Sequence, residues 1–135
     1  MECADERFFY YWRHGMYGHA RNLVISDPER LKNDRKFGLY AALVDGIMGQ
    51  TELAIDGLSV LDGYDDQLLI HPTAKLCIYR TSKLEFDELA LKTEIERAMK
   101  LATPHARQIA GKIAFFFEEF TLAKEIFQEP CGYYG

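Results

Sequence analysis

The chain has few of the residues on which disulfide-bonded, zinc-binding and sheet-rich proteins depend. It contains three cysteines, an odd number, and no Cys-x-x-Cys pair, which argues against a disulfide framework or a zinc ribbon and fits a reducing compartment. Valine occurs only at positions 24, 44 and 60, although sheets are usually built from β-branched residues. Leucine and alanine, which lose little in a helix, are common instead. The composition therefore favours helices.

Targeting and membrane-spanning signals are also missing. The chain opens Met-Glu-Cys-Ala-Asp-Glu, which is acidic where a secretory signal is basic, and no apolar run is long enough to cross a bilayer. The 16 basic and 21 acidic residues give a net charge of −5, which disfavours attraction to nucleic acid and to anionic membranes. We therefore expect a soluble, acidic, cytoplasmic protein that does not bind membranes and for which nucleic acid is a disfavoured partner.

The common cofactor and metal motifs are absent as well. The sequence has no phosphate-cradling Gly-x-x-x-x-Gly-Lys, no dinucleotide-binding Gly-x-Gly-x-x-Gly, no nucleophile-elbow serine and no His-Glu-x-x-His. Each of these motifs sets backbone N–H groups, a nucleophile or metal ligands at the spacing that its chemistry requires. We therefore expect no cofactor and no bound metal.

Proline is scarce, and its four positions predict where elements begin and end. Asp27-Pro28 and Thr103-Pro104 each join a good N-cap side chain to a proline at the first helical position, so each predicts the start of a helix. The first of these helices carries apolar residues at helical spacing to about Ile47, and the second does so without interruption to about Phe127, just before Pro130. Within the second helix a stripe of small residues, which includes Gly111, predicts the close approach of a neighbouring helix.

Three further helices are predicted from spacing and capping. Residues 6–25 are rich in aromatic rings at helical spacing, with a kink or a break at Gly15 and Gly18. Residues 51–61 fit a helix, or alternatively a β-hairpin around Asp56-Gly57. The Ser82-to-Glu85 capping box predicts a helix over about 83–101, and its short link to Pro104 predicts an antiparallel helical pair.

The stretch from Gln67 to Thr81 is the best candidate for strands. Two short apolar runs, 68–70 and 76–79, flank His71-Pro72-Thr73-Ala74, which is typical of a turn. In the competing interpretation Pro72 opens a helix that runs from Thr73 into the 83–101 segment. The periodicity of apolar residues does not distinguish the hairpin from the helix, because both apolar runs are short.

These elements together predict the fold class. We expect a single, mainly α domain over residues 1–135, bundle-like, with about five helices, a closing antiparallel helical hairpin and at most one short β-hairpin from Gln67 to Thr81. The alternative is an α+β fold with a small antiparallel sheet from Thr51 to Thr81. Residues 1–5 and 131–135 are expected to be loosely ordered tails.

Potentially functional side chains are densest between Trp12 and Asn22. This stretch combines arginines, imidazoles, aromatic rings and glycines, so that Arg13, His14 and His19 are the candidate catalytic residues. In the simpler interpretation the rings are core and the cations are solvated. As a binding surface the same region offers three further residues, to which the C-terminal tail adds two tyrosines: Trp12, Tyr17, Arg21, Tyr133 and Tyr134.

Other isolated polar residues have simpler interpretations. His71 is expected in a turn beside proline and His105 in the first turn of a helix, and Cys77 is expected to be a small buried apolar residue. None of the three is expected to bind a metal.

Arg13 and His19 are separated by five residues, with a polar residue directly after the arginine. This spacing resembles the Arg-x(4–6)-His pattern of HEPN-type ribonucleases. In those helical proteins the pair acts on an RNA phosphodiester, usually across a dimer interface. The resemblance covers this one spacing, and it implies that an arginine would stabilise the phosphate charge while a histidine serves as acid or base.

The aromatic surplus favours a non-enzymatic function. Interfaces are enriched in Tyr, Trp, Phe, Met and Arg, all of which occur between Phe8 and Arg21. We expect a protein-interaction or regulatory module that binds a protein partner or a second copy of itself. The alternatives are a phosphodiester- or phosphoryl-acting enzyme that uses Arg13 and His19, and a helical domain that binds a small molecule.

Overall fold

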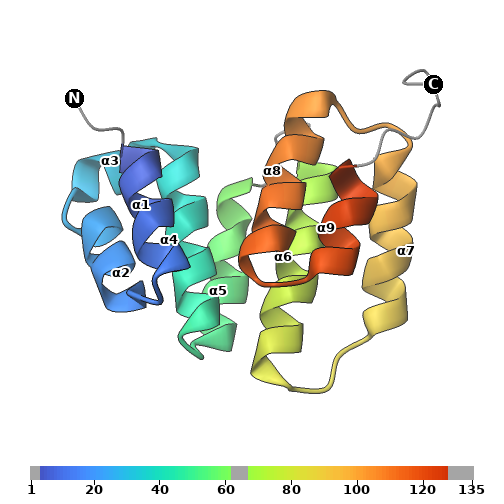
Figure 1. Cartoon of the computed structure of the whole chain (residues 1–135), viewed down its shortest axis with the longest axis horizontal. Coiled ribbons are helices and arrows are strands. Elements are labelled where there is room, and N and C mark those ends of the chain that lie inside the picture. The colour runs from blue at the N-terminus through green and yellow to red at the C-terminus, as the bar shows by residue number, and fades with distance from the viewer. Residues whose placement is uncertain (1–3, 62–66, 128–135) are drawn as a thin grey trace. The chain divides into compact units, whose positions relative to one another are not determined.

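A computed structural model describes residues 4–61 and 67–127, and within these ranges every regular element is a helix (Figure 1). The prediction of a mainly α fold is confirmed, and the α+β alternative with a sheet between Thr51 and Thr81 is wrong. The elements in chain order are α1 (Ala4–Arg13), α2 (Tyr17–Ile25), α3 (Pro28–Asn33), α4 (Arg35–Ile47), α5 (Thr51–Gly57), the 3-10 helix η1 (Leu58–Leu61), α6 (Gln67–Ser82), α7 (Glu88–Met99), α8 (Pro104–Phe116) and α9 (Phe120–Phe127).

The chain divides into two compact units. The first comprises Met1–Asp62 with Ile78–Glu85, and the second comprises Gly63–Cys77 with Phe86–Gly135. Helix α6 therefore contributes its first part to the second unit and its last part to the first. That the chain is one domain remains a prediction. Of the expected tails, residues 4 and 5 already belong to α1, while residues 1–3 and 131–135 lie outside the described ranges.

The core of the first unit is aromatic where α1 meets α4. The ring of Phe8 stacks on that of Tyr40, with centroids 4.3 Å apart and planes 11° apart, and Trp12 packs beside Phe8. Three side chains there are almost fully buried: Phe8 of α1, Val24 of α2 and Val44 of α4. In Figure 1 the blue helices α1 and α2 lie side by side.

The aromatic N-terminal segment is broken rather than kinked. The N–H of Gly15 donates to the carbonyl of Trp12, and that of Met16 donates to the carbonyl of Tyr11, which together form a Schellman motif. Gly15 has φ +71°, a conformation that glycine adopts without the steric penalty of a side chain. Gly15 therefore ends α1, and α2 begins two residues later.

The helix expected from Pro28 to Ile47 is two helices. The carboxylate of Asp27 accepts a hydrogen bond from the N–H of Arg30, which confirms Asp27 as an N-cap. Asp34 then leaves the helical region, with φ −106° and ψ 108°, and its carboxylate accepts from the N–H of Lys36 to cap α4. One residue thus ends α3 and starts α4. At residues 51–61 the predicted helix is confirmed as α5 followed by η1.

The β-hairpin expected from Gln67 to Thr81 is wrong, because this stretch is the single helix α6 with Pro72 inside it. Its apolar side chains are buried on several sides of the helix, among them Leu69, Ile70, Ala74, Leu76 and Ile78. A helix buried nearly all round shows no apolar stripe, so its sequence shows no helical period. Pro72 removes the hydrogen bond to the carbonyl of Leu68, a residue that is 63% exposed.

The helix expected over about 83–101 begins later, at Glu88. Ser82 does not cap it. Its hydroxyl donates to the carbonyl of Tyr79 and accepts from the N–H of Leu84, where α6 ends. Asp87 is the N-cap of α7, because its carboxylate accepts from the N–H of Ala90.

The long C-terminal helix predicted from Pro104 to Phe127 is also two helices. Thr103 caps α8 as expected, since its hydroxyl oxygen accepts from the N–H of Ala106. A second Schellman motif ends α8, in which the N–H of Glu118 donates to the carbonyl of Phe115 and that of Glu119 to the carbonyl of Ala114. Glu118 takes the αL position with φ +62°.

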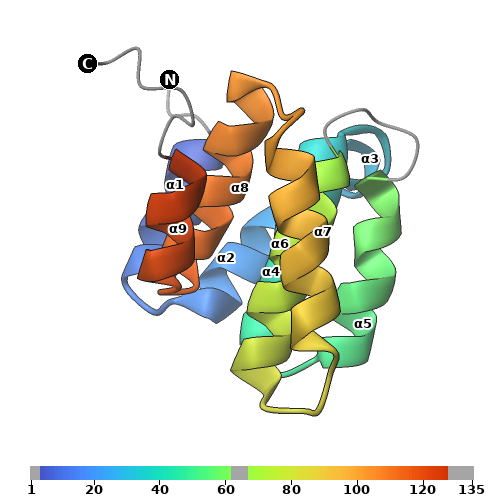
Figure 2. The same ribbon diagram turned by 90° about the vertical axis from the view of Figure 1, so that its right-hand side faces the viewer.

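The closing helical pair is α8 with α9, whereas the sequence predicted that the helix over about 83–101 would pair with the helix from Pro104. Helices α8 and α9 lie side by side and run in opposite directions in both Figure 1 and Figure 2. The predicted small-residue stripe of α8 is buried, and a Cβ built on Gly111 would lie 2.5 Å from the ring of Phe127. The expected close approach at Gly111 is therefore confirmed, although the neighbour is the returning half of what was predicted to be the same helix.

Candidate interaction surface on helices α1 and α2

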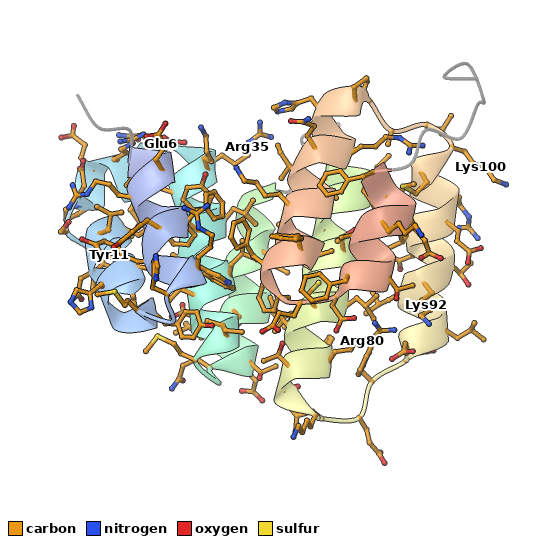
Figure 3. The ribbon with its side chains drawn as sticks, in the orientation of Figure 1. Glu6, Tyr11, Arg35, Arg80, Lys92 and Lys100 are labelled. Atoms are coloured by element: carbon orange, nitrogen blue, oxygen red, sulfur yellow. The ribbon has the colours of Figure 1, made fainter. Side chains whose placement is uncertain are left out.

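Four rings of α1 and α2 form a connected group, which we call the ring cluster: Tyr10, Tyr11, His14 and His19. The ring centroids of His14 and Tyr10 are 4.4 Å apart, those of Tyr10 and Tyr11 are 5.9 Å apart, and those of Tyr11 and His19 are 5.5 Å apart. Tyr10 is 50% exposed and both histidines are exposed, whereas Tyr11 is half-buried. The cluster is therefore a surface feature that joins two helices. Figure 3 labels Tyr11 on α1.

The local sequence explains why these rings meet. Tyr10 and His14 are four residues apart, which places them on the same face of a helix. The Schellman motif at Gly15 then turns the chain so that α2 packs beside α1, and His19 comes against Tyr11. Sequence reasoning named the two histidines but not the two tyrosines, although the spacing of Tyr10 and His14 carried the signal.

Trp12 and Tyr17, both predicted binding residues, lie toward the interior. Trp12 is only 4% exposed and its ring packs against that of Phe8. The rings of Trp12 and Tyr17 meet edge to face with centroids 5.3 Å apart, and Tyr17 is half-buried. Trp12 therefore serves the core of the first unit and offers almost no surface to a partner.

The two arginines of this region differ in their surroundings. The Nε of Arg21 lies 3.2 Å from Oδ1 of Asp45, whose side chain is 13% exposed, so Arg21 holds α2 to α4. Arg13 is exposed in the last turn of α1, where it makes no hydrogen bond or ion pair with any residue that the structure describes. Arg13 is therefore the arginine available to a ligand.

The three candidate catalytic residues are not joined to one another. Within the described ranges no hydrogen bond, ion pair or ring contact links Arg13 to either histidine or links His14 to His19. Each histidine instead contacts a tyrosine. The other two candidate residues, Tyr133 and Tyr134, lie outside the described residues.

The structure also places the isolated residues His71, Cys77 and His105. His105 is exposed in the first turn of α8, as expected, and Cys77 is fully buried, although within a helix. His71 is in the middle part of α6, so the prediction of a turn there is wrong. Over residues 4–61 and 67–127 no group of three or more His, Cys, Asp or Glu side chains is arranged to hold a metal ion.

Sequence reasoning missed Arg107, a buried charge in the second unit that is 7% exposed. Its guanidinium donates to the carbonyl of Met99 at 2.7 Å and to that of Ile126 at 3.2 Å, near the C-terminal ends of α7 and α9. A cation there is favoured by the negative ends of the helix dipoles. This position is structural, because the guanidinium is directed at backbone groups of the protein itself.

None of the helices in the part of the chain that the structure describes has the length and apolar character needed to span a bilayer. No protein-family model, curated protein or solved structure matches this chain. Function is therefore inferred from the geometry of the chain itself.

Proposed function

We propose that this chain is a non-enzymatic protein-interaction module and that the ring cluster is its binding surface. The main observation in support is that the exposed rings of Tyr10, His14 and His19 are connected through ring contacts with Tyr11 across α1 and α2. Exposed tyrosine and arginine are the residues in which protein interfaces are enriched. The chain's cysteine usage supports a cytoplasmic location for the module.

The ring contacts also favour binding on entropic grounds. Ordering a free side chain at an interface costs about 0.5–1.5 kcal/mol. Here Tyr10 is already held between Tyr11 and His14, and His19 is held against Tyr11. Rings that are positioned before a partner arrives lose less freedom on binding, so the cluster is suited to recognition.

Site-specific photo-crosslinking tests the proposal in the cells that make the protein. A benzophenone amino acid replaces Tyr10 in one variant and Leu89 in the control, since Leu89 is 74% exposed on α7 in the second unit. We expect discrete crosslinked protein bands from position 10 and only a diffuse background from position 89. The absence of discrete bands at position 10, or the same bands at both positions, would contradict the proposal.

The competing enzyme hypothesis makes a different prediction. If Arg13 and His19 cleave RNA, the purified chain should degrade single-stranded RNA, and Arg13→Ala and His19→Ala should each lower the rate by about a hundredfold or more. We expect no cleavage above the level of the double variant, because the two side chains do not contact each other. If the chain cleaves RNA and both substitutions abolish the cleavage, the proposal of an interaction module is wrong and the chain is an enzyme.

A further inference from the structure

Charge is distributed unevenly around the ring cluster. Residues 7–26 contain three arginines and no aspartate or glutamate, in a chain whose net charge is −5. The remaining 115 residues therefore hold 13 basic and 21 acidic residues, a formal charge of −8. Residues 7–26 are thus positive within a negative protein, although Asp5 and Glu6 in the first turn of α1 come just before them, and they attract the negative charge that most of the chain repels.

The free cation lies directly beside the exposed rings. Tyr10, Arg13 and His14 stand at positions i, i+3 and i+4 of one helical stretch, which places them on a common face. All three are exposed, and Arg13 has no ionic partner among the residues described. Arg21, by contrast, is already paired with Asp45. A ligand that approaches this face meets aromatic carbon and one unneutralised guanidinium together.

From this arrangement we infer that the partner presents an acidic peptide segment to Tyr10, Arg13 and His14. The inference rests on the proposed function and adds the chemistry of the partner. A carboxylate accepts two parallel hydrogen bonds from the planar guanidinium of Arg13, the geometry in which arginine binds carboxylates best. The apolar side chains of the same peptide segment pack on the rings of Tyr10 and His14. These contacts bury apolar surface, which the ion pair alone does not.

The ring geometry favours a peptide over a single-stranded nucleic acid. Bases stack on open aromatic faces, and proteins that bind single strands offer several such faces along a positive groove. Here the ring planes are inclined to one another by 51° between Tyr10 and His14, 67° between Tyr10 and Tyr11, and 41° between Tyr11 and His19. The rings therefore form no continuous platform on which successive bases could stack.

The test is a titration followed by the backbone amide signals of the isotope-labelled full chain in NMR. Three probes are compared: a short peptide of glutamate and leucine residues, the same peptide with glutamine in place of glutamate, and oligouridylate. We expect the glutamate peptide to shift the signals of residues 10–19 and to bind more weakly as NaCl is raised. Arg13→Ala should weaken that binding about tenfold, which corresponds to about 1.4 kcal/mol.

Arg97→Ala is the matched control. Arg97 is exposed in the last turn of α7, as Arg13 is in α1, and residues 97–117 also contain no acidic residue. The control should leave binding of the glutamate peptide unchanged, because Glu94 and Ala98 stand at the positions around Arg97 that Tyr10 and His14 occupy around Arg13. Equal weakening by both substitutions would show attraction to general positive charge and would overturn the inference.

Other results would overturn it too. These are equal binding of the glutamine peptide, no shift with any peptide, tighter binding of oligouridylate at residues 10–19, or self-association of the chain that Arg13→Ala abolishes. Failure of the inference is distinguishable from failure of the proposed function. If discrete crosslinks at position 10 persist while the glutamate peptide does not bind, the surface binds a partner whose chemistry is not acidic.

Discussion

Glu118 has a backbone conformation that is unfavourable for residues with a side chain. Its φ of +62° places it in the αL region, which costs an L-residue about 1–2 kcal/mol, while glycine adopts it freely. Gly15 and Gly49 occupy αL positions at the ends of α1 and α4, with φ of +71° and +92°. A glutamate therefore takes a position that glycine takes at two other helix ends of the chain.

We expect Glu118→Gly to stabilise the protein. The αL strain is relieved, but the extra freedom of glycine in the unfolded chain offsets part of the gain, which leaves about 0.5–1 kcal/mol. The free energy of unfolding in urea measures the effect. Gly49→Ala is the matched control and should destabilise the protein by about 1 kcal/mol, because it introduces the same strain. A loss of stability in Glu118→Gly would show that the glutamate side chain contributes more than its backbone conformation costs.

Asp34 gives the second prediction at the scale of a residue, and it concerns pH. Partial burial raises the pKa of the Asp34 carboxyl, but hydrogen bonds from the Lys36 N–H and the Arg30 side chain, with the charges of both residues, outweigh it and lower the pKa below 3.8. A carboxyl whose pKa is lower in the folded protein stabilises the fold above its unfolded pKa. That contribution is lost as the pH falls through the folded pKa.

Asp34→Asn isolates this effect, because asparagine caps a helix about as well as aspartate but carries no charge. At neutral pH the variant should be less stable by a few tenths of a kcal/mol, since the Arg30 ion pair is largely exposed. The difference should shrink as the pH falls below about 3.8 and vanish once the pH lies below the lowered pKa of the folded protein. Urea unfolding of both proteins at a series of pH values measures it, and a difference that does not depend on pH would refute the assignment to charge.

At the scale of helices, glycines inside two elements serve different purposes. A Cβ on Gly46 of α4 would lie 2.7 Å from Cγ1 of Ile78 of α6, a fully buried and stiff side chain. A Cβ on Gly18 of α2 would meet nothing within 4 Å. Gly46 therefore permits the contact of two helices, and Gly18 does not.

The same substitution should consequently have opposite effects at the two positions. Alanine gains up to about 1 kcal/mol over glycine in a helix. Gly18→Ala should realise part of this gain, whereas Gly46→Ala should lower stability by about 1–3 kcal/mol through overpacking. Thermal unfolding of both variants measures the difference, and a stable Gly46→Ala would show that α4 and α6 are loosely packed there.

Helix starts were more predictable than helix ends. Asp27 and Thr103 each place an acceptor three residues before the N–H that needs one, so the starts of α3 and α8 follow from local chemistry. The breaks at Asp34 and Glu118 were not predicted, because neither residue is a glycine or a proline and the apolar spacing continues through both. At Glu118 the packing of α9 back onto α8 outweighs the local cost of the turn.

At the scale of the whole molecule, α6 belongs to both compact units. A helix propagates cooperatively along its length, so the loss of either unit removes packing from a helix that the other unit also needs. The expectation of a single domain becomes the prediction that the chain unfolds in one transition. Trp12 reports on the first unit, and it is the only tryptophan of the chain.

Arg107→Met in the second unit provides the test. It leaves the carbonyls of Met99 and Ile126 without this donor and should cost about 2 kcal/mol or more. With one transition, the fluorescence of Trp12 and the far-UV circular dichroism should shift to the same lower temperature. If Arg107→Met moves the circular dichroism transition and leaves that of Trp12 in place, the chain consists of two independent domains.

The sequence alone determined that this protein is helical and where several of its helices start, because propensity, N-caps and prolines act within a few residues. It also placed both histidines of the ring cluster in one segment. Only the tertiary structure decided that residues 67–82 form one helix, that residues 104–127 form two, and that Trp12 is buried while Tyr10 is exposed. A helix that is buried on all sides has apolar residues all round, so its sequence shows no helical period. The position of the turn between α8 and α9 depends on the packing of α9 against α8. Neither effect is visible in a single stretch of residues.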